Sequence, residues 1–175
     1  MDIKEYKIDL LNRVRAGSDA MASFTKDNFF EEISKILMDR GIYDDIEPHV
    51  YINTQRGINI DGYCWNDIEK VLSGIIVKYS NDEELVTISQ SEIEKLGKQC
   101  SKFISNITNE KFLNSLAVTD PGRGLADALL NYKEPAVKFR IIVITDHVLS
   151  NRVKLNKIKI DNIFDKETKI DIYDL

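Results

Sequence analysis

The stretch that most constrains the fold is "KFRIIVIT", residues 138–145, a continuous run of apolar, mostly β-branched residues. A strand with one face in water alternates apolar and polar residues, whereas this run is apolar at nearly every position. Both of its faces must therefore be covered. The sequence predicts a strand in the interior of a sheet that has helices on both faces.

Three shorter β-rich runs precede it and predict an antiparallel meander. They are "EPHVYIN" (47–53), "INIDGYCWN" (58–66) and "VLSGIIVKYS" (71–80), and the segments between them are short enough for hairpins. The alternating run "TKIDIYDL" (168–175) predicts a last, more exposed strand.

Helical periodicity marks the remaining segments. Residues 3–16 and 25–42 carry apolar stripes, and we expect Gly17-Ser18 to end the first helix and Gly41 the second. A third stripe runs to Ile107, with Ser91 and Glu94 as its predicted capping box, and Pro121 suits the first turn of a further helix. The predicted order is ααβββααββ, an α/β (α+β) domain with a mixed sheet over residues 1–175.

Composition indicates an ordinary soluble, cytoplasmic protein. The chain has 175 residues, of which 43% are hydrophobic and 30% charged, and it contains no apolar run long enough to span a bilayer. Its N-terminus is too charged for a signal peptide. Cys64 and Cys100 lack metal-ligand spacing, so we expect two buried thiols.

The formal net charge of −5 hides a local excess of basic residues between 133 and 159. An acidic chain is a poor non-specific ligand for nucleic acid, yet one cationic edge can guide a strand of DNA or RNA. Arg152, Lys154 and Lys157 are the candidates for that contact. The alternative is a solvated face with no ligand.

Asp61 stands inside the second strand of the predicted meander, where an ionised carboxylate costs several kcal/mol unless it is paired. Its partner is either a cation of the protein or a bound metal ion. Lys78, on the neighbouring strand, is the predicted partner for a buried ion pair. The residues alone leave both interpretations open.

The order of elements resembles the restriction-endonuclease-like, or PD-(D/E)xK, core, whose metal-binding aspartate occupies the position of Asp61. More closely, "FFEEISKIL", "INIDGYCWN", "IIVKYS", "SQSEIEKLGKQCSKFI" and "IIVITDHVLSNRVK" resemble successive blocks of the N-terminal domain of AIPR-type (abortive infection phage resistance) proteins. Such proteins continue past this domain, so the resemblance implies the N-terminal part of a longer protein.

The resemblance implies a Mg²⁺ or Mn²⁺ site and a catalytic lysine, which here is Lys78. The sequence departs from the family pattern at Ile76, where the family has an acid. This departure removes a metal ligand, because hydrocarbon cannot bind a hard cation. Glu32, at the border of its helix's apolar stripe, and Gln90, near the start of the crossover helix, are the candidates to complete the metal site with Asp61.

The sequence therefore leaves two functions open. The first is a degenerate nuclease-like domain that acts in phage resistance as a sensor or interaction module, with a phage protein or the C-terminal domains of a longer chain as its partner. The second is an active metal-dependent nuclease that cleaves DNA or RNA through Asp61, Lys78 and Glu32. The missing acid at position 76 favours the first.

Overall fold

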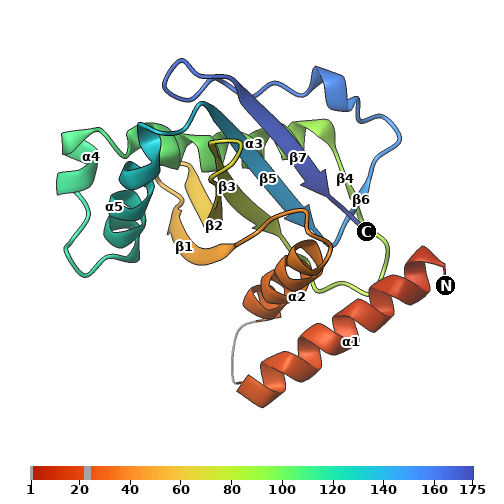
Figure 1. The fold of residues 1–175 in the computed structure, drawn as a ribbon. Helices are drawn as coiled ribbons and strands as arrows, with labels where there is room; N and C mark the ends of the chain where they lie inside the picture. Colours follow the sequence, from red (N-terminus) through yellow and green to blue (C-terminus); the bar gives the residue numbers. More distant parts are fainter. Residues whose placement is uncertain (1, 22–24) are drawn as a thin grey trace.

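The computed structural model describes residues 2–21 and 25–175 and shows a mixed α/β fold (Figure 1). Its elements follow the predicted order, with four short elements added. In chain order, the elements are α1 (Ile3–Met21), α2 (Thr25–Asp39), β1 (Glu47–Asn53), β2 (Ile58–Asn66), β3 (Val71–Lys78), β4 (Thr87–Ile88), α3 (Gln90–Asn106), α4 (Glu110–Asn114), α5 (Pro121–Lys133), β5 (Lys138–Thr145), β6 (Val148–Leu149), the 3₁₀ helix η1 (Leu155–Lys157) and β7 (Thr168–Tyr173). The four added elements are β4, α4, β6 and η1.

The main sheet has the strand order β1-β2-β3-β5-β7. The first three strands form the predicted antiparallel meander, and β5 and β7 add to it in parallel. The run at 138–145 is indeed an interior strand, buried on both faces over most of its length. The last strand lies at the sheet edge and is half-buried, as its alternating pattern predicts.

Helices cover both faces of this sheet (Figure 1). On one face α3, α4 and α5 pack against the larger apolar core, which includes Leu72, Ile76 and Phe139. On the other face α1 and α2 bury a second cluster, which includes Val14, Phe29 and Ile75. Successive residues of β3 thus contribute to opposite cores, because side chains alternate across a strand.

The ends of two helices differ from the prediction. The capping box of α3 is formed by Ser89 and Glu92, two residues before the predicted pair, and it satisfies backbone N–H groups at both positions. Helix α1 continues through Gly17 and Ser18 to Met21. Ser18 stays helical because its hydroxyl donates to the carbonyl of Val14 at 3.0 Å and accepts from the Asn28 amide at 2.7 Å.

The chain between β5 and β7 packs over the N-terminal half of α3. The side-chain oxygen Oε1 of Gln90 accepts a hydrogen bond from the backbone N–H of Lys154 at 3.3 Å, and its side-chain Nε2 donates to the backbone carbonyl of Lys157 at 3.4 Å. Further along, Ile160 lies so close to Gly97 that a Cβ there would be 2.3 Å from its Cδ1 atom. Gly97 therefore allows this segment to contact the helix backbone closely.

Cys64 and Cys100 are free, buried thiols, as predicted. Burial raises the pKa of the Cys64 thiol to about 11. Among residues 2–21 and 25–175, no helix combines the length and the apolar character needed to cross a bilayer.

Two glycines of α5 provide a matched test of the packing between this helix and β1. A Cβ on Gly122 would lie 2.3 Å from the ring of the buried Tyr51, whereas the atom nearest to a Cβ on Gly124 is 4.0 Å away. Gly122→Ala should lower the free energy of unfolding by about 1–3 kcal/mol through overpacking. Gly124→Ala should raise it by up to about 1 kcal/mol through helix propensity. Urea unfolding followed by circular dichroism measures both, and equal effects of the two substitutions would contradict the packing.

Candidate functional site

The Asp61 carboxylate is almost fully buried, and both of its oxygens are bound by the protein. Oδ1 accepts a hydrogen bond from the ammonium of Lys26, on α2, at 2.5 Å, and Oδ2 accepts one from the backbone N–H of Val77 at 2.7 Å. The predicted ion pair with Lys78 is therefore wrong. The cation comes from the preceding helix because α2 packs against this part of the sheet.

Burial dominates the titration of Asp61. The loss of hydration raises its pKa, while Lys26 and the Val77 N–H act in the opposite direction without cancelling the rise. Lys26 keeps a third of its side chain exposed, so its own charge stays partly solvated. The pair is asymmetric, with a buried anion and a cation at the surface.

Lys78 and Ile76 lie on the face of β3 that is turned toward α3, whereas α2, which carries Lys26, packs on the other face of the sheet. Ile76 is fully buried in the apolar core, while Lys78 lines a cavity of about 290 Å³ together with Asn59, Glu92 and Gln99. Hydrogen bonds from the Ser89 hydroxyl and backbone N–H hold the pKa of Glu92 below its usual range, with a smaller contribution from the nearby Lys78. Lys78 therefore lies in a cavity beside α3 and takes no part in the ion pair between Asp61 and Lys26.

The structure places the other two predicted metal ligands apart from Asp61. Glu32 lies on the side of α2 that meets α1, where its carboxylate is 3.9 Å from the guanidinium of Arg13. The Gln90 amide binds Glu94 and the segment after β6. Within residues 2–21 and 25–175, no three His, Cys, Asp or Glu side chains gather in a group able to hold a metal ion.

The predicted nucleic-acid contacts Arg152, Lys154 and Lys157 are exposed on the segment that includes η1. The backbone of Lys154 and Lys157 is anchored to Gln90, and all three side chains are accessible to solvent. They form one cationic stretch of the surface beside the N-terminal half of α3.

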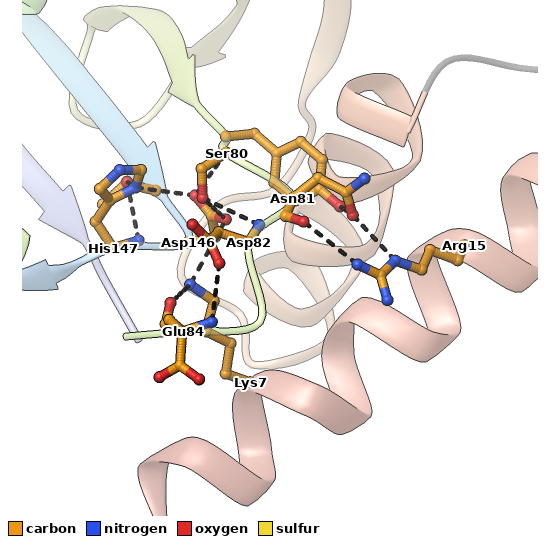
Figure 2. A network of polar contacts seen from close by, with 10 residues as sticks. Lys7, Arg15, Ser80, Asn81, Asp82, Glu84, Asp146 and His147 are labelled. Carbon is orange, nitrogen blue, oxygen red and sulfur yellow. Dashed lines mark hydrogen bonds and ion pairs between the residues drawn. The ribbon is translucent and has the colours of Figure 1, made fainter. Parts of the chain in front are cut away.

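A second buried acid, Asp146, follows β5 at the carboxyl end of the parallel strands (Figure 2). Its Oδ2 atom accepts from the Ser80 hydroxyl at 2.8 Å, and its Oδ1 atom accepts from the Ser80 backbone N–H at 3.0 Å. The ammonium of Lys7, on α1, lies 4.0 Å from Oδ2 and donates to the carbonyl of Glu84 at 2.7 Å. Lys7 and Asp146 are both fully buried.

His147 completes this network from the side away from α1. Its Nδ1 atom lies 2.9 Å from Asp146 Oδ1 and 3.1 Å from the hydroxyl of Thr145. The Ser80 hydroxyl points at the carboxylate and not at the imidazole, so the three groups do not form a nucleophile activated by a histidine (Figure 2). Their geometry fits a structural role, which is to join α1 to the loop after β3.

Sequence reasoning missed this network because Lys7 and Asp146 are far apart in the chain. One signal was present: Lys7 falls on the apolar side of its helix, between Tyr6 and Leu10, where a lysine needs a buried partner. Arg15 on the same helix reinforces the contact by binding the side chain of Glu83 at 2.7 Å.

Fold and site together define the class of the protein. It is a mixed α/β domain that begins its sheet with a three-stranded meander and carries one buried acid on β2 and another after β5. Residues 29–175 match the model of the abortive infection phage resistance protein N-terminal domain, and the chain belongs to that family. No curated protein and no solved structure matches the chain at significant similarity.

Replacing Asp61 with Asn should expose the effect of burial on this carboxyl group. Because the folded-state pKa lies above the unfolded value of about 3.9, the folded protein binds more protons than the unfolded chain above that pH, and stability falls as pH rises. The free energy of unfolding of the wild type minus that of Asp61→Asn should therefore decrease between about pH 4 and the raised pKa, by about 1.4 kcal/mol for each unit of elevation.

Urea titrations of both proteins at a series of pH values measure this difference. Groups distant from Asp61 titrate alike in the two proteins, so their contributions cancel. If the difference in the free energy of unfolding grew with pH instead, the attraction of Lys26 would outweigh burial and the pKa of Asp61 would be lowered.

The two lysines at the start of α1 test the importance of the Asp146 network. Lys7→Met removes the cation beside a buried carboxylate and should lower the free energy of unfolding by about 3 kcal/mol or more. Lys4, one turn earlier, pairs with Glu84 at 3.2 Å on the exposed surface, so Lys4→Met should change it by less than about 1 kcal/mol. Chemical unfolding measures the free energy of unfolding of both variants. Equal losses would show that the buried pair of Lys7 and Asp146 stabilises the fold no more than the exposed pair of Lys4 and Glu84.

Proposed function

We propose that this domain serves phage resistance as a recognition module, built on a restriction-endonuclease-like core whose catalytic centre has been lost. In this interpretation Asp61 stabilises the fold and performs no chemistry. The domain then acts by binding a partner, and any catalytic activity lies outside this domain.

The single observation that carries the proposal is the coordination of Asp61. A metal ion that binds Oδ1 would have to displace the Lys26 ammonium, and one that binds both oxygens would also compete with the Val77 N–H at Oδ2. The second bond extends the contact between β2 and β3, so breaking it would leave a buried N–H without an acceptor at a cost of about 1–3 kcal/mol.

The residues that the nuclease pattern would supply do not fit a divalent cation. Mg²⁺ prefers several oxygen ligands in octahedral geometry. The position where the pattern asks for an acid is Ile76, a hydrocarbon side chain buried in the core toward α3, and Glu32 faces Arg13 instead. Lys78 lies in the α3 cavity, apart from the acid that it would assist.

A charge-free replacement of the pair tests the proposal. Replacing both partners of a buried ion pair with residues of similar shape is often nearly neutral, so Lys26→Met/Asp61→Asn should stay folded. Calorimetric titration of Mn²⁺ should give the same result for the wild type and the double variant. In a host where the full-length wild-type gene reduces phage plating, the double variant should reduce it equally.

Saturable Mn²⁺ binding that disappears in the double variant would contradict the proposal. It would do so most clearly if cleavage of labelled DNA or RNA and the phage resistance disappeared with it. Circular dichroism and thermal unfolding of both proteins ensure that a loss reflects the site and not a misfolded chain.

A further inference from the structure

A cationic groove follows α3 on the surface away from α1 and α2. It consists of two adjoining hollows of about 340 and 400 Å³ that share Lys102, and the second continues into the Lys78 cavity through Lys95 and Gln99. We call it the α3 groove and define it by its polar lining residues Arg56, Lys95, Lys98, Gln99, Lys102 and Lys111.

The groove is assembled from three separate elements. Lys95, Lys98 and Lys102 recur on α3 at spacings of three and four residues, which places them along one side of the helix. Arg56 comes from the turn between β1 and β2, and Lys111 from α4. The turn is fixed to the helix because the Lys102 ammonium donates to the carbonyl of Arg56.

Within the described part of the chain, the cations of the groove form no ion pairs. Each of its five cations is exposed, and none has a carboxylate oxygen within 4.0 Å. Some exposed cations elsewhere, such as Lys4, Arg13 and Lys169, form ion pairs, so the groove differs from those sites in gathering several unpaired cations along one helix. In a protein with 29 acidic and 24 basic residues, a cluster of unpaired cations is a local departure from the average charge.

Two acids belong to these hollows, Glu94 in the lining of the second hollow and Glu92 in that of the adjoining Lys78 cavity, and both accept hydrogen bonds from neighbouring residues. Glu92 caps α3 through the Ser89 hydroxyl at 2.7 Å and the Ser89 N–H at 2.9 Å. Glu94 accepts from the Gln90 amide at 3.0 Å and from the Lys159 N–H at 3.4 Å. The hollow around Arg56 has no acidic residue in its lining.

We infer that the α3 groove binds the sugar-phosphate backbone of a nucleic acid. A row of exposed ammonium groups in a shallow groove matches a row of phosphates, and the release of counterions supplies the free energy. Neutral amide side chains of Gln55, Asn106 and Asn109 also line the hollow and provide further hydrogen-bond donors. The inference rests on the proposed recognition role and names its ligand.

The lining favours contact with the backbone over reading of bases. Its one aromatic residue, Phe112, is buried, and the Arg56 guanidinium lies 5.7 Å from the centre of its ring. No exposed ring of the lining is left to stack on a base. Binding should therefore depend strongly on salt and weakly on sequence.

Fluorescence anisotropy with labelled oligonucleotides of about 20 nucleotides, single-stranded DNA, single-stranded RNA and duplex DNA, tests the inference. The groove variant is Lys95→Gln/Lys98→Gln/Lys111→Gln, because these side chains hold no other part of the fold. It should weaken binding at least about tenfold and reduce the slope of log K against log salt by about two, since each lost phosphate contact removes about 0.7–0.9.

The matched control removes three exposed cations that also lack ion pairs but lie outside the groove, as Lys35→Gln/Arg40→Gln/Lys138→Gln. It makes the same change in net charge and should keep the affinity within about twofold. The variant Arg152→Gln/Lys154→Gln/Lys157→Gln tests the neighbouring basic stretch and should weaken binding less than the groove variant.

Three results would overturn the inference. They are no binding by the wild type in low salt, equal losses in the groove variant and the control, and groove-dependent binding of polyglutamate that is tighter than that of any oligonucleotide. The last would assign the groove to an acidic protein. Cleavage of bound nucleic acid that requires Asp61 would refute the proposed loss of catalysis and leave the groove intact, so the two failures are distinguishable.

Discussion

The structure depends on two buried aspartates that receive their cations from the N-terminal helices. Lys26 of α2 binds Asp61 inside the sheet, and Lys7 of α1 lies beside Asp146 at the end of β5. A buried carboxylate without a partner is strongly unfavourable, so each pair also fixes where its helix must lie. Apolar packing holds α1 and α2 against the sheet, and these lysines determine their register.

The same pairing explains how charge is distributed over the molecule. The acids inside the protein are neutralised from the side of α1 and α2, whereas the lysines of α3 face solvent and form no ion pair with any residue that the structure describes. The chain is acidic overall, yet its α3 side is cationic. The restriction-endonuclease-like arrangement would place acid and lysine at one site, but here Asp61 binds Lys26 and Lys78 lies in the α3 cavity.

Much of the fold follows from local patterns. The buried run at 138–145, the meander and the amphipathic third helix were all predictable, because strand and helix periodicities are properties of short segments. Helix ends were less predictable. Ser89 and Ser91 both offer a hydroxyl three residues before a glutamate, and only the backbone leaving β4 selects Ser89. The first helix continues through Gly17 and Ser18, where Asn28, from α2, binds the serine hydroxyl.

The sequence by itself determined that Asp61 is buried and must have a partner, since the strand around it is apolar and charge is costly in such surroundings. Only the tertiary structure decided that the partner is Lys26, because the choice among lysines depends on which helix packs against that face of the sheet. The cationic groove is likewise a tertiary feature. Arg56 is distant in the chain from Lys111 and the lysines of α3, and chain folding brings the charges of these three elements to one surface.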